Sequence, residues 1–255
     1  MKMKFFHGIP VTVAAILFSH SAFADGVTVK TGYDYSSGKY GTSTTTEITS
    51  IPFIASYEKD DWSFKAVMPY VRISGASNVI SGIGAVSRAN DSVRTTSGWG
   101  DVSLSATKAL WFDAKARMGL DVTGKVKLGT ADSAKGLGTG ENDYWVLADA
   151  YKNIGSITYL GGVGYGMLGD SPLLKLKNVI SANIGAAYKV NEMASIGALF
   201  DARTRSSDTG SAQRELTAFY MLKLGGGYKL QAYALKGFAD GSPDWGAGAN
   251  IGYNF

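Results

Sequence analysis

Residues 244–255 (DWGAGANIGYNF), at the end of the chain, constrain the fold more than any other segment. Every second residue is apolar, from Trp245 to the two aromatic residues Tyr253 and Phe255. The residues between them are small or polar: Asp244, Gly246, Gly248, Asn250, Gly252 and Asn254. Because successive side chains of a β-strand point to opposite sides, the segment predicts a strand with one apolar face and one polar face.

The ending of this strand resembles the closing strand of a bacterial outer-membrane β-barrel, in which alternating apolar residues and a Tyr precede a terminal Phe. The resemblance implies that Tyr253 and Phe255 act as an assembly signal. It also implies two partners, the barrel-assembly machinery and the outer-membrane lipids.

The composition fits a membrane barrel better than a helical membrane protein. The chain of 255 residues contains 33 Gly, and its mean hydropathy is 0.00. It has no run of 18 apolar residues, the minimum for a spanning helix. A barrel needs no such run, because only alternate residues of each strand face lipid.

The first 24 residues read as a cleaved targeting segment. Lys2 and Lys4 precede a short apolar run at residues 9–18, and Ala22-Phe23-Ala24 fits a signal-peptidase site. We therefore expect a signal peptide at residues 1–24, a barrel at residues 25–255, and localisation in the outer membrane of a Gram-negative cell. Cleavage lowers the formal net charge from +4 to +2, and no basic run suggests a nucleic-acid partner.

Strand patterns recur along the whole mature chain, and the connections between them alternate in length. Short turns follow the even-numbered segments and longer, more polar connections follow most of the odd ones, which is typical of outer-membrane barrels. The predicted strands are residues 27–35, 45–57, 62–73, 98–110, 114–128, 143–151, 156–167, 177–190, 194–205, 214–224, 228–238 and 244–255.

The alternation is clearest at residues 114–128, where aliphatic residues alternate with charged ones. In a barrel the apolar face meets lipid and the charged face lines the lumen. This assigns lumen-lining candidates in this segment and in residues 194–205: Lys115, Arg117, Asp121, Lys125, Lys127, Asp201, Arg203 and Arg205. A soluble secreted β-sandwich would show the same periodicity with the apolar face inside, and it remains a less favoured alternative.

The mature chain lacks the usual residues of enzyme and metal sites. Both His residues, His7 and His20, lie in the signal peptide, and the chain has no Cys. Nucleophilic triads and zinc sites therefore lose their usual residues. We predict no enzyme activity, no cofactor and no metal.

The charged lumen face has two possible interpretations. A modest excess of basic residues suggests a path for small polar or anionic solutes. Alternatively, the charges pair with one another and fill a narrow lumen. Residues 74–97 are either a constriction folded into the lumen or a solvated outer loop.

Several short motifs also resemble a group of transporter-like outer-membrane barrels that is loosely related to barrels of the phenol meta-cleavage pathway. These motifs are GWGDV (98–102), KVKLGT (125–130), LGTGEND (137–143) and GFADGSPDWGAG (237–248). The resemblance implies a closed barrel, a transporter role and no cofactor, and it supplies no binding residues.

Together these features predict an all-β protein, a transmembrane up-and-down antiparallel β-barrel of about 12 strands. The predicted function is a porin-like channel for passive diffusion of small solutes of unknown identity. A closed barrel with a structural or surface-binding role is the alternative.

Overall fold

The computed structural model describes residues 26–86, 92–170 and 175–255, so the predicted signal peptide lies outside the described residues. In those ranges the fold is all-β, and no helix is long and apolar enough to cross a membrane. One large antiparallel sheet is composed of β1 (Gly26–Gly38), β2 (Thr46–Lys59), β3 (Trp62–Ala76), β6 (Val93–Trp99), β7 (Val102–Asp113), β8 (Met118–Leu128), β9 (Asp143–Ile154), β10 (Ile157–Met167), β11 (Val179–Lys189), β12 (Ala194–Arg203), β13 (Gln213–Gly225), β14 (Tyr228–Gly237) and β15 (Trp245–Asn254).

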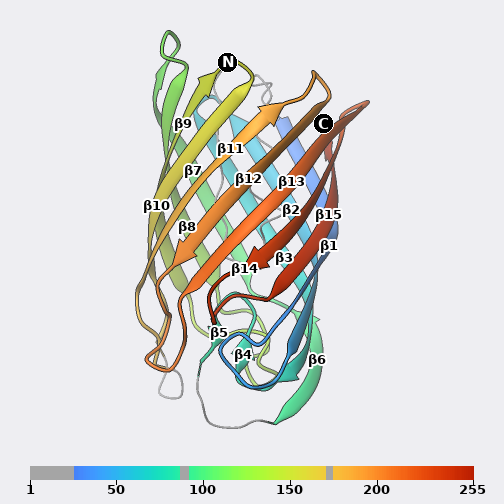
Figure 1. Cartoon of the computed structure of the whole chain (residues 1–255), viewed down its shortest axis with the longest axis vertical. Helices are drawn as coiled ribbons and strands as arrows, with labels where there is room; N and C mark the ends of the chain where they lie inside the picture. Colours follow the sequence, from blue (N-terminus) through green and yellow to red (C-terminus); the bar gives the residue numbers. More distant parts are fainter. Residues whose placement is uncertain (1–25, 87–91, 171–174) are drawn as a thin grey trace.

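The sheet closes into a barrel of twelve strands (Figure 1), as predicted. β6 and β7 both pair with β3 and act as one barrel strand, with a bulge at Gly100 and Asp101. The ring closes where β15 pairs with β1, from Thr28 opposite Asn254 to Ser37 opposite Trp245. Closure leaves no sheet edge in the apolar phase, where an unpaired backbone group would be costly.

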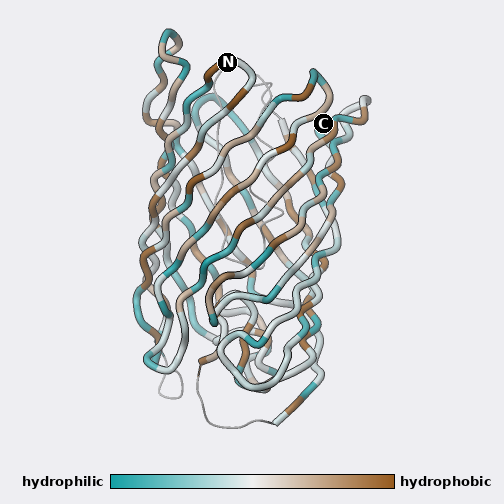
Figure 2. Tube along the Cα trace, viewed as in Figure 1, coloured by the Kyte–Doolittle hydropathy of each residue, from teal (hydrophilic) through white to brown (hydrophobic). Residues whose placement is uncertain are grey.

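Side chains alternate between the outside and the lumen along each strand. In β9, Asp143, Trp145 and Leu147 point inward and are buried, whereas Tyr144 and Val146 point outward and are 50% and 54% exposed. Figure 2 shows the resulting alternation of hydrophilic and hydrophobic residues along the barrel. The burial pattern therefore separates an exposed, largely apolar outer face from a buried inner face that contains both polar and apolar residues.

The two ends of the barrel differ in the length of their connections. Short connections follow β2, β7, β9, β11 and β13, and both ends of the described chain lie at this tight-turn end (Figure 1). Longer connections gather at the opposite, loop end. The predicted alternation of connection length is therefore confirmed.

One predicted strand boundary is wrong in a way that affects the site. β8 begins at Met118, not at residue 114. The carboxylate of Asp113 accepts hydrogen bonds from the backbone N–H groups of Lys115 (2.8 Å) and Ala116 (2.9 Å). Arg117 has a φ of 52°, outside the β region. Residues 114–117 therefore form a turn stabilised by the Asp side chain.

Phe255 offers a test of the assembly signal. Its ring packs edge-on against Tyr253, with centroids 4.7 Å apart, and its N–H donates to the carbonyl of Val27 (2.9 Å). We expect deletion of Phe255 to lower the amount of folded barrel in outer-membrane fractions several-fold, measured by heat-modifiable electrophoretic mobility. Phe238→Ala is the control, because Phe238 is also exposed (59%) but lies in the connection before β15. Equal levels of the two variants would contradict a signal at the C-terminus.

Candidate functional site

A short hairpin enters the lumen at the loop end. We call residues 77–86 the inner hairpin. It contains β4 (Val79–Ile80) and β5 (Gly84–Ala85), which pair only with each other in the described residues. Gly82 and Gly84 adopt φ values of 78° and 94°, which favour glycine, so the chain can reverse within three residues. Figure 1 shows β4 and β5 at the end opposite the C-terminus.

The inner hairpin spans the lumen by packing against opposite walls. Val79 and Ala85 join a buried cluster with inward residues of β2 and β3, among them Ile48 and Ile73. Ile80 and Ile83 join another cluster on the β9 and β11 side, with Trp145, Leu147 and Val179. Of the two predicted arrangements of residues 74–97, the inward one holds for residues 77–86, whereas residues 87–91 lie outside the described chain.

Polar contacts hold the tip of the inner hairpin against β12 and the loop that follows. The guanidinium group of Arg203 donates to the carbonyl of Gly82 (2.9 Å) and to that of Ile83 (3.1 Å). The hydroxyl of Ser206 donates to the Ile83 carbonyl (3.2 Å). Arg203 is only 7% exposed, so its guanidinium group interacts with other protein groups and hardly with solvent.

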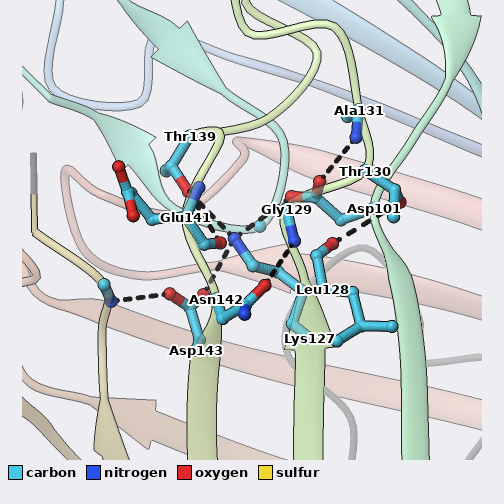
Figure 3. A network of polar contacts seen from close by, with 12 residues as sticks. Asp101, Lys127, Leu128, Gly129, Thr130, Ala131, Thr139, Glu141, Asn142 and Asp143 are labelled. Atoms are coloured by element: carbon cyan, nitrogen blue, oxygen red, sulfur yellow. Dashed lines mark hydrogen bonds and ion pairs between the residues drawn. The ribbon is translucent and has the colours of Figure 1, made fainter.

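Lys127 is the centre of another polar network at the loop end (Figure 3). Its ammonium group lies 3.1 Å from a carboxylate oxygen of Asp101 and 3.0 Å from one of Asp143, and it donates to the hydroxyl of Thr139 (3.0 Å). Asp101 accepts from the N–H of Ala131 (2.9 Å), and Asp143 accepts from the N–H of Gly169 (2.9 Å). The network therefore ties the loops after β8 and β10 to the barrel wall.

The eight predicted lumen residues do not form one group. Lys115 and Arg117 lie in the exposed turn between β7 and β8, and Arg205 lies beyond β12 with a side chain that is 55% exposed. These three cations therefore lie outside the strands, contrary to the positions that periodicity predicts for them. The other five lie on inward strand positions: Asp121, Lys125, Lys127, Asp201 and Arg203.

Acidic residues occupy one cross-strand row of the lumen wall. Asp121 pairs with Asp149 across β8 and β9, and Asp201 pairs with Glu215 across β12 and β13. Asn183 of β11 lies between these pairs and is directly opposite Asp201. A Cβ on Gly162 would collide with the Asp149 carboxylate, so the glycine leaves room for that side chain. The described residues contain no group of three or more acidic, His or Cys residues that could hold a metal ion.

Apolar residues fill another part of the lumen nearer the tight-turn end. A buried cluster joins inward residues of β9 to β13: Tyr151, Leu160, Ala187, Leu199 and Phe219.

At the loop end, a cavity of about 90 Å³ lies between the inner hairpin and the wall formed by β3, β7 and β8, and Lys125 and Lys127 line it.

Tyr40, in the loop between β1 and β2, supports the closed arrangement of the loop end. It is 6% exposed and shares a hydrogen bond of 2.7 Å with the hydroxyl of Ser36. Burial raises the pKa of the Tyr40 hydroxyl above its usual value.

Sequence reasoning did not identify the inner hairpin contacts or the role of Asp143. A signal for the hairpin was present, because Val79, Ile80 and Ile83 are unusually apolar for a solvated loop. Nothing in the sequence indicated that the tip would contact Arg203, about 120 residues further along the chain.

No family model matches the chain, and no curated protein matches it either. Solved structures do match. A COG4313 outer membrane channel from Pseudomonas putida F1 has a TM-score of 0.69 at 15% identity, covering 92% of this chain and 98% of that one. The translocator domain of the autotransporter NalP from Neisseria meningitidis has a TM-score of 0.57 at 12% identity, covering 92% of this chain and 90% of that one.

The KdgM porin, solved in complex with disordered oligogalacturonate, has a TM-score of 0.53 at 8% identity, covering 89% of this chain and 99% of that one. The chain therefore has the fold of bacterial outer-membrane β-barrels, and its structural neighbours include channels and porins. The predicted link to the phenol meta-cleavage group stays a prediction.

Lys127 should contribute strongly to stability. The side chains of Lys127, Asp101 and Asp143 are 13%, 10% and 0% exposed, so Lys127→Met leaves two carboxylates without their cation. Removing one partner of a buried ion pair typically costs about 3–5 kcal/mol. We expect a loss of at least about 3 kcal/mol in the free energy of unfolding, measured by urea titration in lipid vesicles with tryptophan fluorescence.

Lys125→Met is the matched control, because Lys125 lies on the same face of β8 but has no carboxylate within ion-pairing distance among the described residues. We expect this control to be neutral or slightly stabilising. Equal losses in both variants would show that the network has no special role.

Proposed function

We propose that this protein is an outer-membrane channel for passive diffusion of small solutes, and that the inner hairpin closes its loop end in the state described. The observation that carries the proposal is that part of the charged inner wall lines a cavity instead of forming an ion pair, as Lys125 does beside the inner hairpin. The channels among the structural neighbours support it.

The inner hairpin is suited to be a movable closure. It forms its own two-stranded sheet and contributes no backbone pairing to the barrel. Its tip is bound through the carbonyls of Gly82 and Ile83, and these groups can exchange Arg203 for water. Displacing the hairpin therefore leaves every barrel strand paired.

A closed barrel with a structural or surface-binding role is the second candidate. The observation in its favour is the apolar packing of the inner hairpin, since Val79 is 0% exposed and Ile80 and Ile83 are each 6% exposed. Such packing opposes opening, because burial of an aliphatic side chain contributes about 1.5–3 kcal/mol.

The remaining parts of the proposal concern location and partners. We place the protein in the outer membrane of a Gram-negative cell, after cleavage of residues 1–24 and insertion by the barrel-assembly machinery. Outer-membrane lipids would cover the apolar exterior, including a hollow of about 770 Å³ beside outward-facing Ala55, Ala66 and Gly124. The proposal includes no enzyme activity, since the mature chain lacks His and Cys.

Planar-bilayer recording of the purified barrel tests the function through Arg203. Arg203→Ala removes two charge-assisted hydrogen bonds, each worth about 1.5–3 kcal/mol. The ratio of open to closed states should therefore rise about tenfold or more, because 1.4 kcal/mol corresponds to a factor of ten. Arg205→Ala is the matched control, because Arg205 is exposed and donates no hydrogen bond to the inner hairpin among the described residues.

A variant in which a short Gly-Ser linker replaces residues 79–85 should conduct continuously. The channel would be supported by two results. The linker variant should give larger conductance steps than the wild type, and gating should change in Arg203→Ala but not in Arg205→Ala. Silence of the wild type and of all three variants, with folding verified by electrophoretic mobility, would favour the closed barrel.

A further inference from the structure

A cross-strand row of alanines crosses the outer face of the barrel. Each residue of the row lies directly opposite the next one: Ala186 of β11, Ala198 of β12, Ala218 of β13, Ala234 of β14 and Ala247 of β15. We call these residues the alanine row. A tyrosine stands at each end, because Tyr159 of β10 is opposite Ala186 and Tyr35 of β1 is opposite Ala247. Since neighbouring strands are about 4.7–4.9 Å apart, the row extends over roughly 19 Å.

The alanine row is the floor of an apolar groove. A hollow of about 680 Å³ lies on this face, and its lining includes Ala186, Ala218 and Ala234. Larger outward side chains border the row towards the loop end: Ile184, Phe200, Leu216, Lys236 and Trp245. Over β11 to β13, others border it towards the tight-turn end: Tyr188, Ile196 and Tyr220. A long apolar groove fits an extended hydrocarbon chain, because each carbon atom gains contacts on several sides.

Among the outward strand positions of β11 to β15, only Arg214 and Lys236 are charged, and both are cationic. Lys236 is directly opposite Leu216, and the N–H of Phe238 donates to the carbonyl of Arg214 (2.8 Å), so the two cations are diagonal neighbours. Such neighbours are about 7–8 Å apart, within reach of long side chains. Both side chains can therefore bind one group between them.

The side chains of Arg214 and Lys236 form no ion pair among the described residues. Glu215, the neighbour of Arg214 in the sequence, is 3% exposed and belongs to the inner face. The exposed carboxylates of the connection before β15, Asp240 and Asp244, do not pair with either cation. The pair therefore presents its charge to the surroundings of the barrel.

The two cations lie where the outer face approaches the loop end. Arg214 is the second residue of β13, and Lys236 is the last but one of β14. Trp245 is directly opposite Lys236, is 50% exposed and has its ring centroid 5.2 Å from that of Tyr35. Trp and Tyr are enriched at membrane–water interfaces, and a cation on the lipid face costs least there.

The groove leads from this interfacial level towards the middle of the barrel wall. Ala234 is two residues from Lys236 on the same face of β14, so the alanine row passes beside the cations. Its other end, Ala186, lies three residues before the end of β11 and hence nearer the tight-turn end. A lipid with its headgroup at the loop end can therefore extend a chain along the groove.

We propose that the alanine row, with Arg214 and Lys236, binds a phosphorylated lipid of the leaflet that surrounds the loop end. The phosphate oxygens accept hydrogen bonds from the guanidinium and ammonium groups, and an acyl chain lies in the groove. A second copy of the chain fits less well, because a two-fold interface places the same patch on both sides. It would bring cations together where the outward strand positions of β11 to β15 offer no carboxylate.

Native mass spectrometry of the detergent-solubilised barrel measures lipid binding without conduction, so the site and the channel can fail separately. The probes are bisphosphorylated lipid A and the same lipid A after removal of its phosphates. We expect the wild type to bind the phosphorylated form about tenfold more tightly or better, because its phosphate forms charge-assisted hydrogen bonds. Equal affinity for the two forms would overturn the proposal.

The variants separate the headgroup contacts from the groove. Arg214→Gln with Lys236→Gln should remove the preference for the phosphorylated form. Ala218→Phe fills the middle of the groove and should weaken binding of both forms several-fold. Arg72→Gln is the charge control, because Arg72 is also outward and exposed near the loop end, but on β3. Ala66→Phe, in the other outer hollow, is the size control. Both controls should stay within twofold of the wild type.

Folding of every variant is verified by heat-modifiable mobility. Equal weakening in Arg72→Gln and in the double variant would show a general attraction to cations and overturn the site. Unchanged binding in Ala218→Phe would overturn the groove. A dimer of the wild type that retains no lipid and is lost in Ala218→Phe would assign the groove to a second copy instead.

Discussion

Closure of the sheet between β1 and β15 is the constraint on which the rest of the structure depends. An apolar membrane offers no partner for a backbone N–H or C=O group, so a spanning sheet must leave no edge. Once the ring is closed, the two faces of every strand have fixed environments. Apolar side chains face outward, and polar or charged side chains must be accommodated inside a narrow lumen.

The lumen accommodates its charges in two different ways, and two lysines of β8 show the contrast. Lys127 lies between Asp101 and Asp143 and ties two loops to the wall. Lys125, on the same face, has no such carboxylate and lines a cavity instead. Structural pairing therefore holds for Lys127, whereas the proposed solute path concerns Lys125. This distinction requires three-dimensional neighbours, because both lysines have the same periodicity.

The sequence alone predicts the barrel, but it does not predict the contacts of the candidate site. Alternation and turn length predict the strands, their number and the closure, because these depend on local patterns and on the requirement that every edge be paired. Lys115 and Arg117 were misassigned because Ala114 and Ala116 continue the alternation into a turn stabilised by Asp113. The contact between Arg203 and the inner hairpin joins residues about 120 positions apart, which no local pattern encodes.

If the inner hairpin opens as proposed, its packing limits the movement. Ejecting the whole hairpin would expose Val79, Ile80 and Ile83 at once, at about 1.5–3 kcal/mol for each side chain. The pairs Val79 with Ala85 and Ile80 with Ile83 belong to different clusters on opposite walls. A movement that keeps Val79 and Ala85 in place and releases Ile80 and Ile83 costs less. Arg203 and Ser206 bind the Ile83 carbonyl, on the side that would be released, so breaking these contacts favours that smaller movement.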